Sequence, residues 1–530
     1  MTIFKFKNNI WLFGAVLLAV FAVSAGVRYQ QFKTWKKTPS AYFVGERPMM
    51  TTLDAPYWLN LAYVYNEGDF QSKDKFRGYP SGSTTFQKKS VPQYFKDTPR
   101  NSSPAISSQA SSEIPIISYR DVPLLSFLIA HLAPYFNDNY YLAGTLLIPL
   151  LASLFILPLG VYFFQIGVPL SGMMGGLIGT FAGGYYMRSA IGRIDTDMLN
   201  LFFPVMAGLL ILLAGRAKNE RTVLLYVMAS GFSLFLFQWW YSKPGFILAY
   251  FAVLVFNLFV HKIRFRTILL SSLLFVLSTH PSTFINGASS TQGFYKSYFI
   301  IEEVASGVKH DNGTIPASFP NVFTTISEVD HVPMSEVLRR VLSNTILDWI
   351  GFVGFFGLAI FRWRVLLPLA PMLALGLLSF QSSNRFIMYL APFIGIGLGW
   401  LLQLGIEWGF LLIKKNIDHR GVEDKKVKGK RLKAKVSLWT SFYSLATETH
   451  LESTSKDNDN KVKGESNKIK DERLKVKGPF WEGREIDWFG WTRQGALYLV
   501  MGMFFWLISG QTAISFVPGP SIHTGLYATF

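Results

Sequence analysis

The sequence of 530 residues contains no cysteine, so no disulfide bond can hold it together, although this absence says little about its compartment. Charged residues are scarce as well: they make up 16% of the chain, whereas 50% is hydrophobic and 16% is aromatic. Several runs exceed 16 residues without a charge, and the mean hydropathy is positive. This composition excludes an ordinary soluble protein and indicates a polytopic helical membrane protein.

Acidic residues are fewer than basic ones, 33 against 51, which gives a net charge of +18. A charge of this size is typical of proteins that bind nucleic acid, but its distribution argues against that class. Much of it lies in one lysine-rich segment and in short loops between apolar runs, which is how a membrane protein marks its cytoplasmic side. We therefore expect contact with membrane lipid and no nucleic-acid partner.

Eleven apolar runs are interpreted as membrane spans, and we expect about 11–13 such helices in all. The first run follows Lys5 and Lys7. It is interpreted as a retained helix rather than a signal peptide, because no small-residue cleavage site stands out and many spans follow. The runs cover residues 8–27, 141–164, 168–187, 199–215, 222–240, 245–260, 267–279, 345–361, 365–380, 385–413 and 495–516.

Short basic loops orient these spans, because basic residues favour the cytoplasmic side. Four such loops are expected inside, at residues 215–221, 261–266, 361–364 and 414–420. The alternation of spans then places five loops outside: three longer ones at residues 28–140, 188–198 and 280–344, and two short ones at 239–245 and 381–385. Within the first of these, residues 122–136 are apolar but short for a span, so we expect a helix at the membrane interface.

The chain divides into three parts by composition. Residues 1–413 form a transmembrane domain with the catalytic candidates, 414–494 a lysine-rich cytoplasmic insertion, and 495–530 the last helix with a short outer tail. The insertion carries imperfect repeats, "KVKGKRLKAKV" and "ERLKVKG", and its low complexity and high charge favour disorder. It is interpreted as a solvated linker or, alternatively, as an electrostatic patch for a membrane or a partner.

Acidic residues gather in the expected outer loops. They are Asp54 in "TTLDAPYWLN", Asp195 and Asp197 in "YYMRSAIGRIDTDMLNLFFP", and Glu328 in "FTTISEVDHVP". Arg188 and Arg385 are expected outside too. Because the topology follows from basic inner loops alone, the shared face of these acids is an independent check on it.

Carboxylates from three separate loops suit a hard divalent cation, which takes oxygen ligands and keeps open positions for phosphate or substrate. Asp195 and Asp197 stand two residues apart, and in extended backbone their side chains would point to opposite sides. One can then bind the metal while the other orients an arginine or the second ligand. An arginine suits the phosphate itself, because its planar fork binds two oxygens.

Each acid also has an ordinary explanation when it is taken alone. Asp54 is compatible with a solvated loop residue, and the Asp-x-Asp pair with capping of the helix expected at 199–215. Glu328 alone is less specific still. The residues by themselves therefore indicate an outward-facing site for a phosphorylated ligand, with or without a metal, and they leave the substrate open.

Taken together, the motifs resemble those of the catalytic subunit of oligosaccharyltransferase, in particular the bacterial and archaeal single-subunit kind. "YYMRSAIGRIDTDMLN" is similar to the family's Asp-x-Asp motif, including the arginine seven residues before the first aspartate, and "TISE" to its Thr-Ile-x-Glu motif. "WWYSKPG" is similar to the Trp-Trp-Tyr-Pro type of loop, "RFIMYLAPFIGIGLG" to the Arg-Phe-x-x-Tyr-x-x-Pro segment and "TLDAPYWL", more weakly, to the first acidic loop. The motifs stand in the family's order over about residues 40–410.

This resemblance implies an all-α polytopic protein with the GT-C glycosyltransferase fold. It implies a metal-dependent, inverting glycosyltransferase that moves a glycan from a polyisoprenyl-(pyro)phosphate donor to the asparagine of Asn-x-Ser/Thr in an acceptor polypeptide. A multi-pass protein of a prokaryotic inner or plasma membrane is expected, with its active site on the periplasmic or extracellular face.

The resemblance also implies a role for each matching residue. The expected ligands of Mn²⁺ or Mg²⁺ are Asp54, Asp195 and Glu328. The catalytic candidates are Asp54 and Glu328, which would also hold the acceptor amide, with Asp197 and Arg188 in support. The candidates for contact with the donor pyrophosphate are Tyr241 and Arg385.

The sequence departs from the family in one respect. The family's Trp-Trp-Asp-Tyr-Gly motif, which lies in a C-terminal soluble domain and reads the acceptor serine or threonine, is not found here. We therefore expect that domain on a separate chain, or a split or truncated gene, or another way of reading the acceptor. Two other functions stay open: a GT-C glycosyltransferase that transfers to lipid or to serine and threonine, and a non-catalytic scaffold or decayed paralogue.

Overall fold

The computed structural model is almost entirely helical in the residues that it describes. These are residues 10–68, 70, 122–241, 244–285, 287, 289, 291–292, 333–380, 384–423 and 488–521. The chain divides into two compact units. Unit 1 comprises Met1–Thr38, Ile148–Ile191 and Thr196–Gly519, and unit 2 comprises Pro39–Leu147, Gly192–Asp195 and Pro520–Phe530.

Six helical segments of the described residues are long and apolar enough to cross a membrane, and the chain is a multi-pass membrane protein. They are Ile10–Lys37, Tyr140–Gln165, Thr196–Arg216, Glu220–Trp240, Thr345–Phe380 and Ile387–Phe410. Shorter apolar helices lie at Leu124–Phe136, Gly245–Val260 and Phe265–Thr279. The all-α polytopic class expected from the sequence is therefore confirmed.

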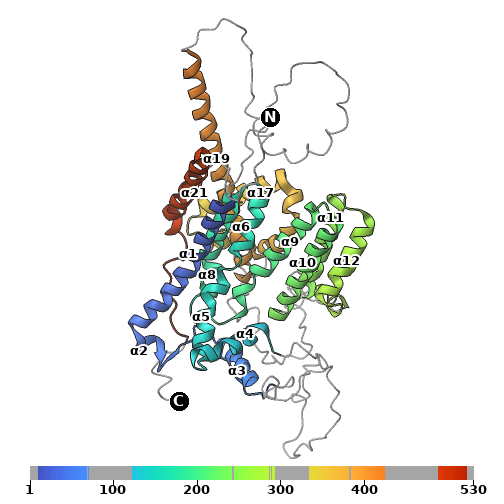
Figure 1. Ribbon diagram of the computed structural model, residues 1–530. Helices are drawn as coiled ribbons and strands as arrows, with labels where there is room; N and C mark the ends of the chain where they lie inside the picture. Colours follow the sequence, from blue (N-terminus) through green and yellow to red (C-terminus); the bar gives the residue numbers. More distant parts are fainter. Residues whose placement is uncertain are drawn as a thin grey trace, which may run out of the picture. The chain divides into compact units, whose positions relative to one another are not determined.

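Most helices belong to unit 1 (Figure 1). They are α1 (Ile10–Lys37), α6 (Ile156–Gln165), α7 (Pro169–Phe181), α8 (Gly183–Tyr186), α9 (Phe202–Arg216), α10 (Glu220–Trp240), α11 (Pro244–Val260), α12 (Phe265–Thr279), α16 (Met334–Arg339), α17 (Thr345–Leu366), α18 (Ala370–Leu377), α19 (Ile387–Glu423) and α21 (Trp488–Ser509). Short 3₁₀ turns separate some of them: η4 (Met187–Ser189), η5 (Thr196–Leu199), η6 (Leu367–Leu369), η7 (Leu378–Phe380) and η8 (Asn384–Phe386).

The span expected at residues 168–187 is shorter in the structure than the sequence predicts. Helix α7 has 13 residues and ends at Phe181, because Ala182 adopts extended backbone with a ψ of 136°. A helix of that length rises roughly 20 Å, less than the roughly 30 Å hydrocarbon core of a bilayer. The chain beyond Ala182 then turns through α8 and η4 toward the Asp-x-Asp loop.

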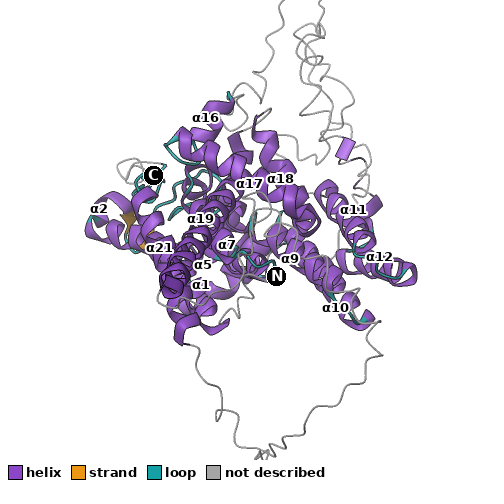
Figure 2. Cartoon of the chain, turned by 90° about the horizontal axis from the view of Figure 1, so that it is seen from above, coloured by secondary structure: helices purple, strands orange, loops and turns teal. Residues whose placement is uncertain are grey.

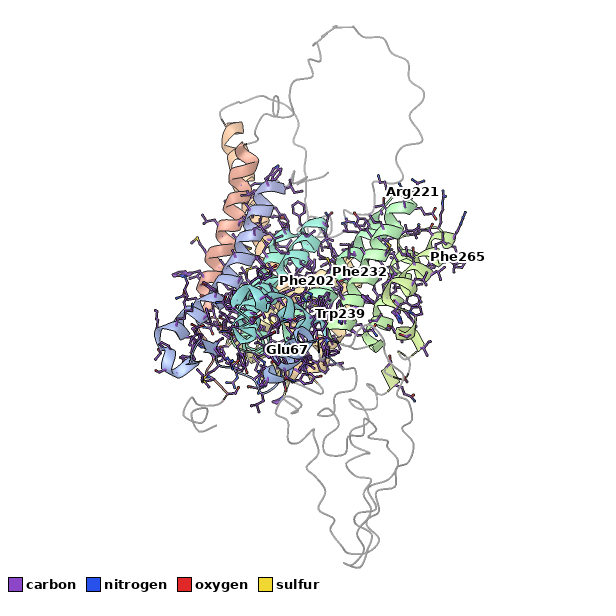
Figure 3. The ribbon with its side chains drawn as sticks, turned by 60° about the horizontal axis from the view of Figure 1, so that its bottom comes forward. Glu67, Phe202, Arg221, Phe232, Trp239 and Phe265 are labelled. Carbon is purple, nitrogen blue, oxygen red and sulfur yellow. The ribbon has the colours of Figure 1, made fainter. Side chains whose placement is uncertain are left out.

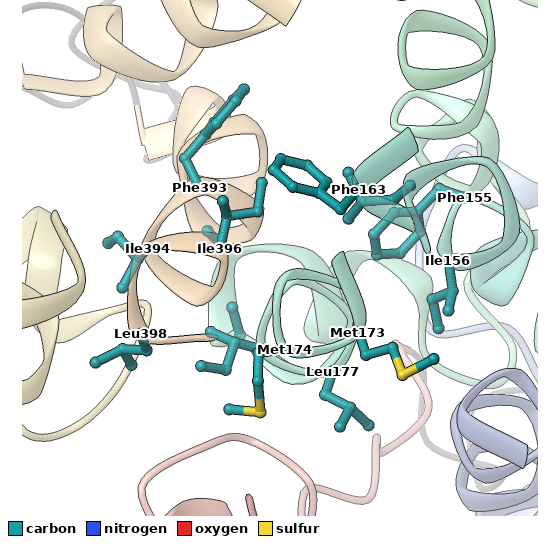
Figure 4. Packing of buried hydrophobic residues seen from close by; sticks show 14 of the residues in the cluster. Phe155, Ile156, Phe163, Met173, Met174, Leu177, Phe393, Ile394, Ile396 and Leu398 are labelled. Carbon is teal, nitrogen blue, oxygen red and sulfur yellow. The ribbon is translucent and has the colours of Figure 1, made fainter. Parts of the chain in front are cut away.

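Helices α7 and α19 pack closely, and their contact forms the centre of the hydrophobic core (Figure 4). Every residue of α7 is buried. Glycines permit the approach: a Cβ atom on Gly395 would lie 2.6 Å from the carbonyl oxygen of Met174 and 2.9 Å from the Cα of Gly175. This contact matters for the site, because α7 leads to Arg188 and α19 begins just after Arg385.

Helices α9 to α12 form a second group of neighbours within unit 1 (Figures 1 and 2). Helix α10 packs against α9 and α12. Two side chains of α11 donate hydrogen bonds to carbonyl oxygens of α9: the Tyr250 hydroxyl to Pro204 at 3.0 Å and the Asn257 amide to Ile211 at 3.0 Å. Inside an apolar bundle such bonds hold helices at a defined register.

The turn at residues 165–169 has no charge of its own, yet arginines from two expected inner loops bind it. The Arg216 guanidinium donates to the carbonyl oxygen of Gln165 at 2.7 Å, and Arg362 donates to that of Ile166. Cations are favourable at the C-terminal ends of helices such as α6. Because Arg216 ends α9, this basic group lies at the opposite end of that helix from Asp197.

Unit 2 holds the one β-ribbon of the described residues and a pair of packed helices. Its elements are α2 (Pro39–Tyr42), β1 (Phe43–Val44), β2 (Arg47–Pro48), α3 (Ala55–Asn66), α4 (Leu124–Leu132), η3 (Ala133–Phe136) and the first part of α5 (Tyr140–Ser153). Strands β1 and β2 are antiparallel, with Phe43 opposite Pro48. The helix expected at 122–136 is present, and its apolar face is buried against α3.

The ends of the expected cytoplasmic insertion are helical. Helix α19 continues past the boundary at 413 to Glu423, and α21 begins at Trp488, before the boundary at 495. Helices α19 and α21 therefore extend beyond the boundaries expected for this segment. The remainder of 414–494 lies outside the described residues.

Candidate functional site

The buried carboxylate of Asp197 is the centre of a polar cluster in unit 1. It lies in η5, and its side chain has no exposed surface. Its Oδ2 accepts a hydrogen bond from Arg188 Nη1 at 2.9 Å, and its Oδ1 accepts from Arg385 Nη2 at 3.1 Å and from Asn200 Nδ2 at 3.0 Å. Residues 188 and 385, far apart in the sequence, therefore meet on one aspartate.

The three charged side chains of this cluster carry one negative and two positive charges. Arg188 is nearly buried, at 12% exposure of its side chain, whereas Arg385 keeps 32%. An arginine held in place by a buried carboxylate and still partly open suits recognition of a phosphate group.

The end of α10 completes the cluster. The ring of Tyr241 lies under the Arg385 guanidinium, with 5.6 Å between the ring centroid and Cζ. The preceding residue, Trp240, donates from its indole Nε1 to the carbonyl oxygen of Thr196 at 2.6 Å. The beginning of the "WWYSKPG" segment, in which Figure 3 labels Trp239, therefore contacts the Asp-x-Asp segment through Trp240, as expected from their placement on one face.

A buried arginine in α1, which the sequence did not single out, holds the turn that carries Arg188. Arg28 has no exposed surface. Its Nε and Nη2 donate to the carbonyl and hydroxyl oxygens of Ser189 at 2.9 and 2.8 Å. Its Nη1 and Nη2 also reach the hydroxyl and carbonyl oxygens of Thr180, at 2.9 and 3.1 Å. Arg28 thus joins the end of α7 to η4.

Neutral groups surround Arg28, and its bonds to backbone carbonyl oxygens are a common way to satisfy an intramembrane cation. Its guanidinium lies over the rings of Tyr185 and Tyr186, with centroids at 5.8 and 4.9 Å. Gln31, one turn further along α1, donates to the Tyr186 hydroxyl at 3.0 Å and accepts from the Ile191 backbone at 3.1 Å. In the sequence, Arg28 directly follows an apolar run, at a position where we expected a loop. Helix α1 instead continues to Lys37.

Two of the expected metal ligands, Asp54 and Asp195, belong to unit 2. The backbone N–H of Thr51 donates to the carbonyl oxygen of Gly192 at 3.1 Å. Because each of these residues stands three positions before its aspartate, the two loops lie side by side. Asp54 is exposed at the start of α3 and makes no capping bond through its side chain, whereas Asp195 is 7% exposed.

The third expected ligand, Glu328, lies outside the described residues. Among the residues that the structure does describe, no group of three or more histidine, cysteine, aspartate or glutamate side chains forms a metal site. Two carboxylates on adjoining loops nevertheless supply the oxygen atoms that a hard divalent cation prefers. The expected set of metal ligands therefore stays a prediction, and the positions of Asp54 and Asp195 are compatible with it.

The Asp-x-Asp segment differs from the expected geometry. Thr196–Leu199 forms a 3₁₀ turn, so the expectation of extended backbone through Asp197 is wrong. Capping of the following helix does not explain the pair either, because α9 begins at Phe202 after Leu201 without a side-chain capping bond. The turn instead directs Asp197 toward its two arginines.

Comparison with known proteins agrees with this arrangement. Residues 122–415 match the family described as oligosaccharyl transferase STT3, N-terminal. The chain belongs to the oligosaccharyl transferase STT3 family. The match includes the Asp-x-Asp loop, the end of α10 and Arg385. The resemblance seen in the sequence motifs is therefore confirmed.

One bacterial relative of this STT3-family chain is the undecaprenyl-diphosphooligosaccharide–protein glycotransferase of Campylobacter jejuni subsp. jejuni. It is 25% identical to this chain over 304 residues. A protein of the same name from C. jejuni strain RM1221 matches at the same identity. The alignment covers 50% of this chain and 41% of the relative. This chain therefore matches less than half of the relative's length.

Solved structures of the Archaeoglobus fulgidus oligosaccharyltransferase AglB are also similar. One, in complex with an inhibitory peptide and a dolichol-phosphate, is 16% identical, with a TM-score of 0.45 over 83% of this chain and 54% of that one. The apo form is 14% identical, with a TM-score of 0.43 over 84% and 55%. The GT-C class of this STT3-family chain rests on the family match and on its own helices.

Proposed function

We propose that this chain transfers a glycan from a polyisoprenyl-(pyro)phosphate carrier to the asparagine of Asn-x-Ser/Thr in an acceptor polypeptide. Membership of the STT3 family and the name of the C. jejuni relative support this reaction. One observation in the structure carries it: Arg385 rests on Tyr241, is held by Asp197 and remains partly exposed. That arrangement is suited to a pyrophosphate leaving group.

The reaction is a single displacement at the sugar C1 atom. The acceptor amide nitrogen forms a bond to C1 and loses a proton, while the bond from C1 to the phosphate oxygen breaks and its electron pair leaves with the pyrophosphate. Attack from the opposite side inverts the configuration at C1. Negative charge develops on the departing oxygen, and the Arg385 guanidinium stabilises it.

Asp197 and Arg188 are supporting residues in this proposal. Both oxygens of the Asp197 carboxylate accept hydrogen bonds from the cluster, so its function is to fix the two arginines. Fixed donors cost no reorganisation when charge develops. Asp54 and Glu328 would hold the amide of the acceptor asparagine through their carboxylates.

Asp54, Asp195 and Glu328 would also hold a divalent cation, Mn²⁺ or Mg²⁺. The fit rests on the adjoining loops of Asp54 and Asp195 in unit 2 and on their oxygen chemistry. When bound, such an ion supplies positive charge that stabilises a departing phosphate oxygen.

The proposed location is a prokaryotic inner or plasma membrane, with the arginine cluster facing the periplasm or the exterior. The basic loop ends at Arg216 and Arg362 favour the cytoplasm for one end of the bundle. Asp197 lies at the other end of α9. The polyisoprenyl donor and the acceptor polypeptide would therefore both be used at the outer surface.

A transfer assay with the purified full chain in detergent tests this function. The substrates are a labelled polyisoprenyl-pyrophosphate glycan and peptides that carry Asn-x-Thr, Gln-x-Thr or Asn-x-Ala. We expect transfer to the asparagine of the Asn-x-Thr peptide and to neither the Gln-x-Thr nor the Asn-x-Ala peptide, with dependence on Mn²⁺ or Mg²⁺. Transfer to a lipid or to the Gln-x-Thr peptide would contradict the proposal, and so would full activity in chelator.

A donor-binding assay tests the arginine cluster separately from the transfer reaction as a whole. We expect Arg385→Ala to weaken binding of the labelled donor by at least about ten-fold, since a charge-assisted contact to phosphate is lost. Arg339→Ala is the matched control, because Arg339 is 62% exposed and pairs with Glu336 instead. Equal binding by both variants would remove Arg385 from the donor site.

A further inference from the structure

A cavity of about 1130 Å³ opens within unit 2. Its walls come from one face of α3, from the end of α4 with η3, from the start of α5 and from β2. None of the residues proposed above for donor, metal or acceptor binding lines it. The cavity therefore needs a separate explanation.

The first wall is a regular helix face. Pro56, Asn60, Tyr63 and Glu67 line the cavity at intervals of three and four residues, which places them on one side of α3 and its C-cap. Figure 3 labels Glu67, the C-cap residue of this helix. Tyr63 keeps 49% of its surface exposed, although it is a large aromatic residue. A polar amide and a tyrosine ring thus stand next to each other on an open surface.

The opposite wall is a fixed corner between η3 and α5. Asn137 and Asp138 both have left-handed backbone, with φ values of 55° and 57°, a conformation that asparagine and aspartate tolerate best. Asn139 then secures the corner: its Oδ1 accepts from the Leu142 N–H at 2.9 Å and its Nδ2 donates to the Glu46 carbonyl oxygen at 3.2 Å. Asp138 and Asn139 are therefore presented to the cavity on a preformed turn.

Contacts of aromatic side chains join the α3 wall of the cavity to the wall at η3 and α5. The rings of Tyr63 and Tyr140 meet edge to face, with centroids 5.7 Å apart. Asn66 donates to the Tyr140 hydroxyl at 3.1 Å and to the Ala130 carbonyl oxygen at 2.8 Å. Arg47 lies over the ring of Tyr141, 5.6 Å from its centroid. The cavity is thus shaped before any ligand arrives, which lowers the entropic cost of binding.

The lining chemistry selects the class of ligand. In a chain with a net charge of +18, the charged side chains of this cavity are Glu67 and Asp138 against Arg47, which already contacts an aromatic ring. That balance disfavours phosphate and other anions. The amides and carboxylates also disfavour a lipid tail, because their polar atoms would be buried without partners.

We propose that this cavity binds a neutral oligosaccharide. Sugars present hydroxyl groups that both donate and accept. The Asn60 amide offers both functions in one plane, and the carboxylates of Glu67 and Asp138 accept hydrogen bonds. Sugar rings also present an apolar C–H face, which suits the exposed ring of Tyr63. Since binding requires neither a donor lipid nor a metal, this inference stands or falls independently of the proposed transfer reaction.

Saturation-transfer difference NMR on the full chain in detergent micelles measures such binding. The probes are neutral trisaccharides of glucose and of N-acetylglucosamine, each without a lipid and in the presence of chelator. We expect binding of at least one probe, and at least about ten-fold weaker binding in Tyr63→Ala, where the aromatic contact is lost. The matched control is Tyr57→Ala, on the same helix and 41% exposed but outside the cavity, and it should bind as the unmodified chain does.

Asn60→Ala provides a second variant in case Tyr63→Ala does not fold, because Asn60 is an exposed residue of the same face. We expect a comparable loss in this variant. Failure of both trisaccharides to bind would overturn the proposal, as would binding that neither variant weakens. Displacement experiments with an Asn-x-Thr peptide complete the test: a peptide that binds the cavity where no saccharide does identifies a polypeptide site instead.

Discussion

Asp197 in unit 1 and Asp54 in unit 2 are both carboxylates close to the start of a helix, yet their surroundings differ. Asp197 has no exposed surface and accepts hydrogen bonds from two arginines and an asparagine. Asp54 is exposed, and its side chain makes no capping bond to α3. A buried carboxylate with its hydrogen bonds already made is suited to positioning other groups, whereas an exposed one remains accessible to a ligand.

The same contrast applies to the arginines. Arg28 is fully enclosed and bonded to neutral oxygens, so it fixes backbone; Arg385 keeps 32% of its side chain exposed and is suited to a substrate. Burial, more than residue type, therefore separates the groups that shape the site from the groups proposed to act on a ligand. Variants at each kind of position should differ in whether they lose stability or activity.

The largest effect is expected for Asp197→Ala. Removing this carboxylate leaves two arginines without their shared partner, one of them nearly buried, and breaking a buried ion pair costs about 3–5 kcal/mol. Asp54→Ala should change the free energy of unfolding by less than about 0.5 kcal/mol, as exposed positions usually do. Denaturant titration of both variants in detergent, followed by tryptophan fluorescence, compares them. Equal stability of the two variants would contradict the positioning role of Asp197.

The next largest effect is expected for Arg28→Met. This change keeps most of the side-chain volume but leaves the oxygens of Ser189 and Thr180 without their donor, at a cost of about 3 kcal/mol. Lys33→Met is the matched control on the same helix, because Lys33 is exposed and faces only the ring of Tyr29. Thermal unfolding of the two variants should differ clearly. Similar midpoints would show that Arg28 does not hold the turn.

The candidate metal ligands Asp54 and Glu328 should show the reverse behaviour. Asp54→Asn and Glu328→Gln are expected to keep the thermal stability of the unmodified chain while transfer falls on the order of 10²-fold or more, since charge stabilisation of the leaving group is lost. Chelator should give the same loss, and added Mn²⁺ or Mg²⁺ should restore it only in the unmodified chain. Full activity of the unmodified chain in chelator would exclude the metal role.

Much of the cluster around Asp197 could be predicted from the sequence. The basic loops predict which loops share a face, and the motifs mark Arg188, Tyr241 and Arg385 as neighbours of the Asp-x-Asp segment. The contacts of these residues in unit 1 agree with that grouping. This grouping can be predicted because the membrane constrains where charged residues lie along an apolar chain.

Other features depend on tertiary contacts that no local pattern contains. Nothing near Arg28 in the sequence indicates that its partners are Thr180 and Ser189, more than 150 residues away. The end of α7 at Phe181 was also missed, because "AGGYYM" continues an uncharged run without a break. The cavity of unit 2 was missed for the same reason: its walls combine α3 with the distant corner at Asp138.

The smallest effect is expected for Tyr241→Leu, which tests whether Arg385 needs its aromatic support. A guanidinium over an aromatic ring at a partly exposed position gains about 0.5–1 kcal/mol, so donor binding should weaken about two- to five-fold. Tyr241→Phe keeps the ring and should bind the donor as the unmodified chain does. A loss in Tyr241→Phe equal to that in Tyr241→Leu would instead assign the effect to the hydroxyl group. Because the side chain of Tyr241 is only partly buried, neither variant should change the thermal midpoint, and this separates ligand contact from stability at the same residue.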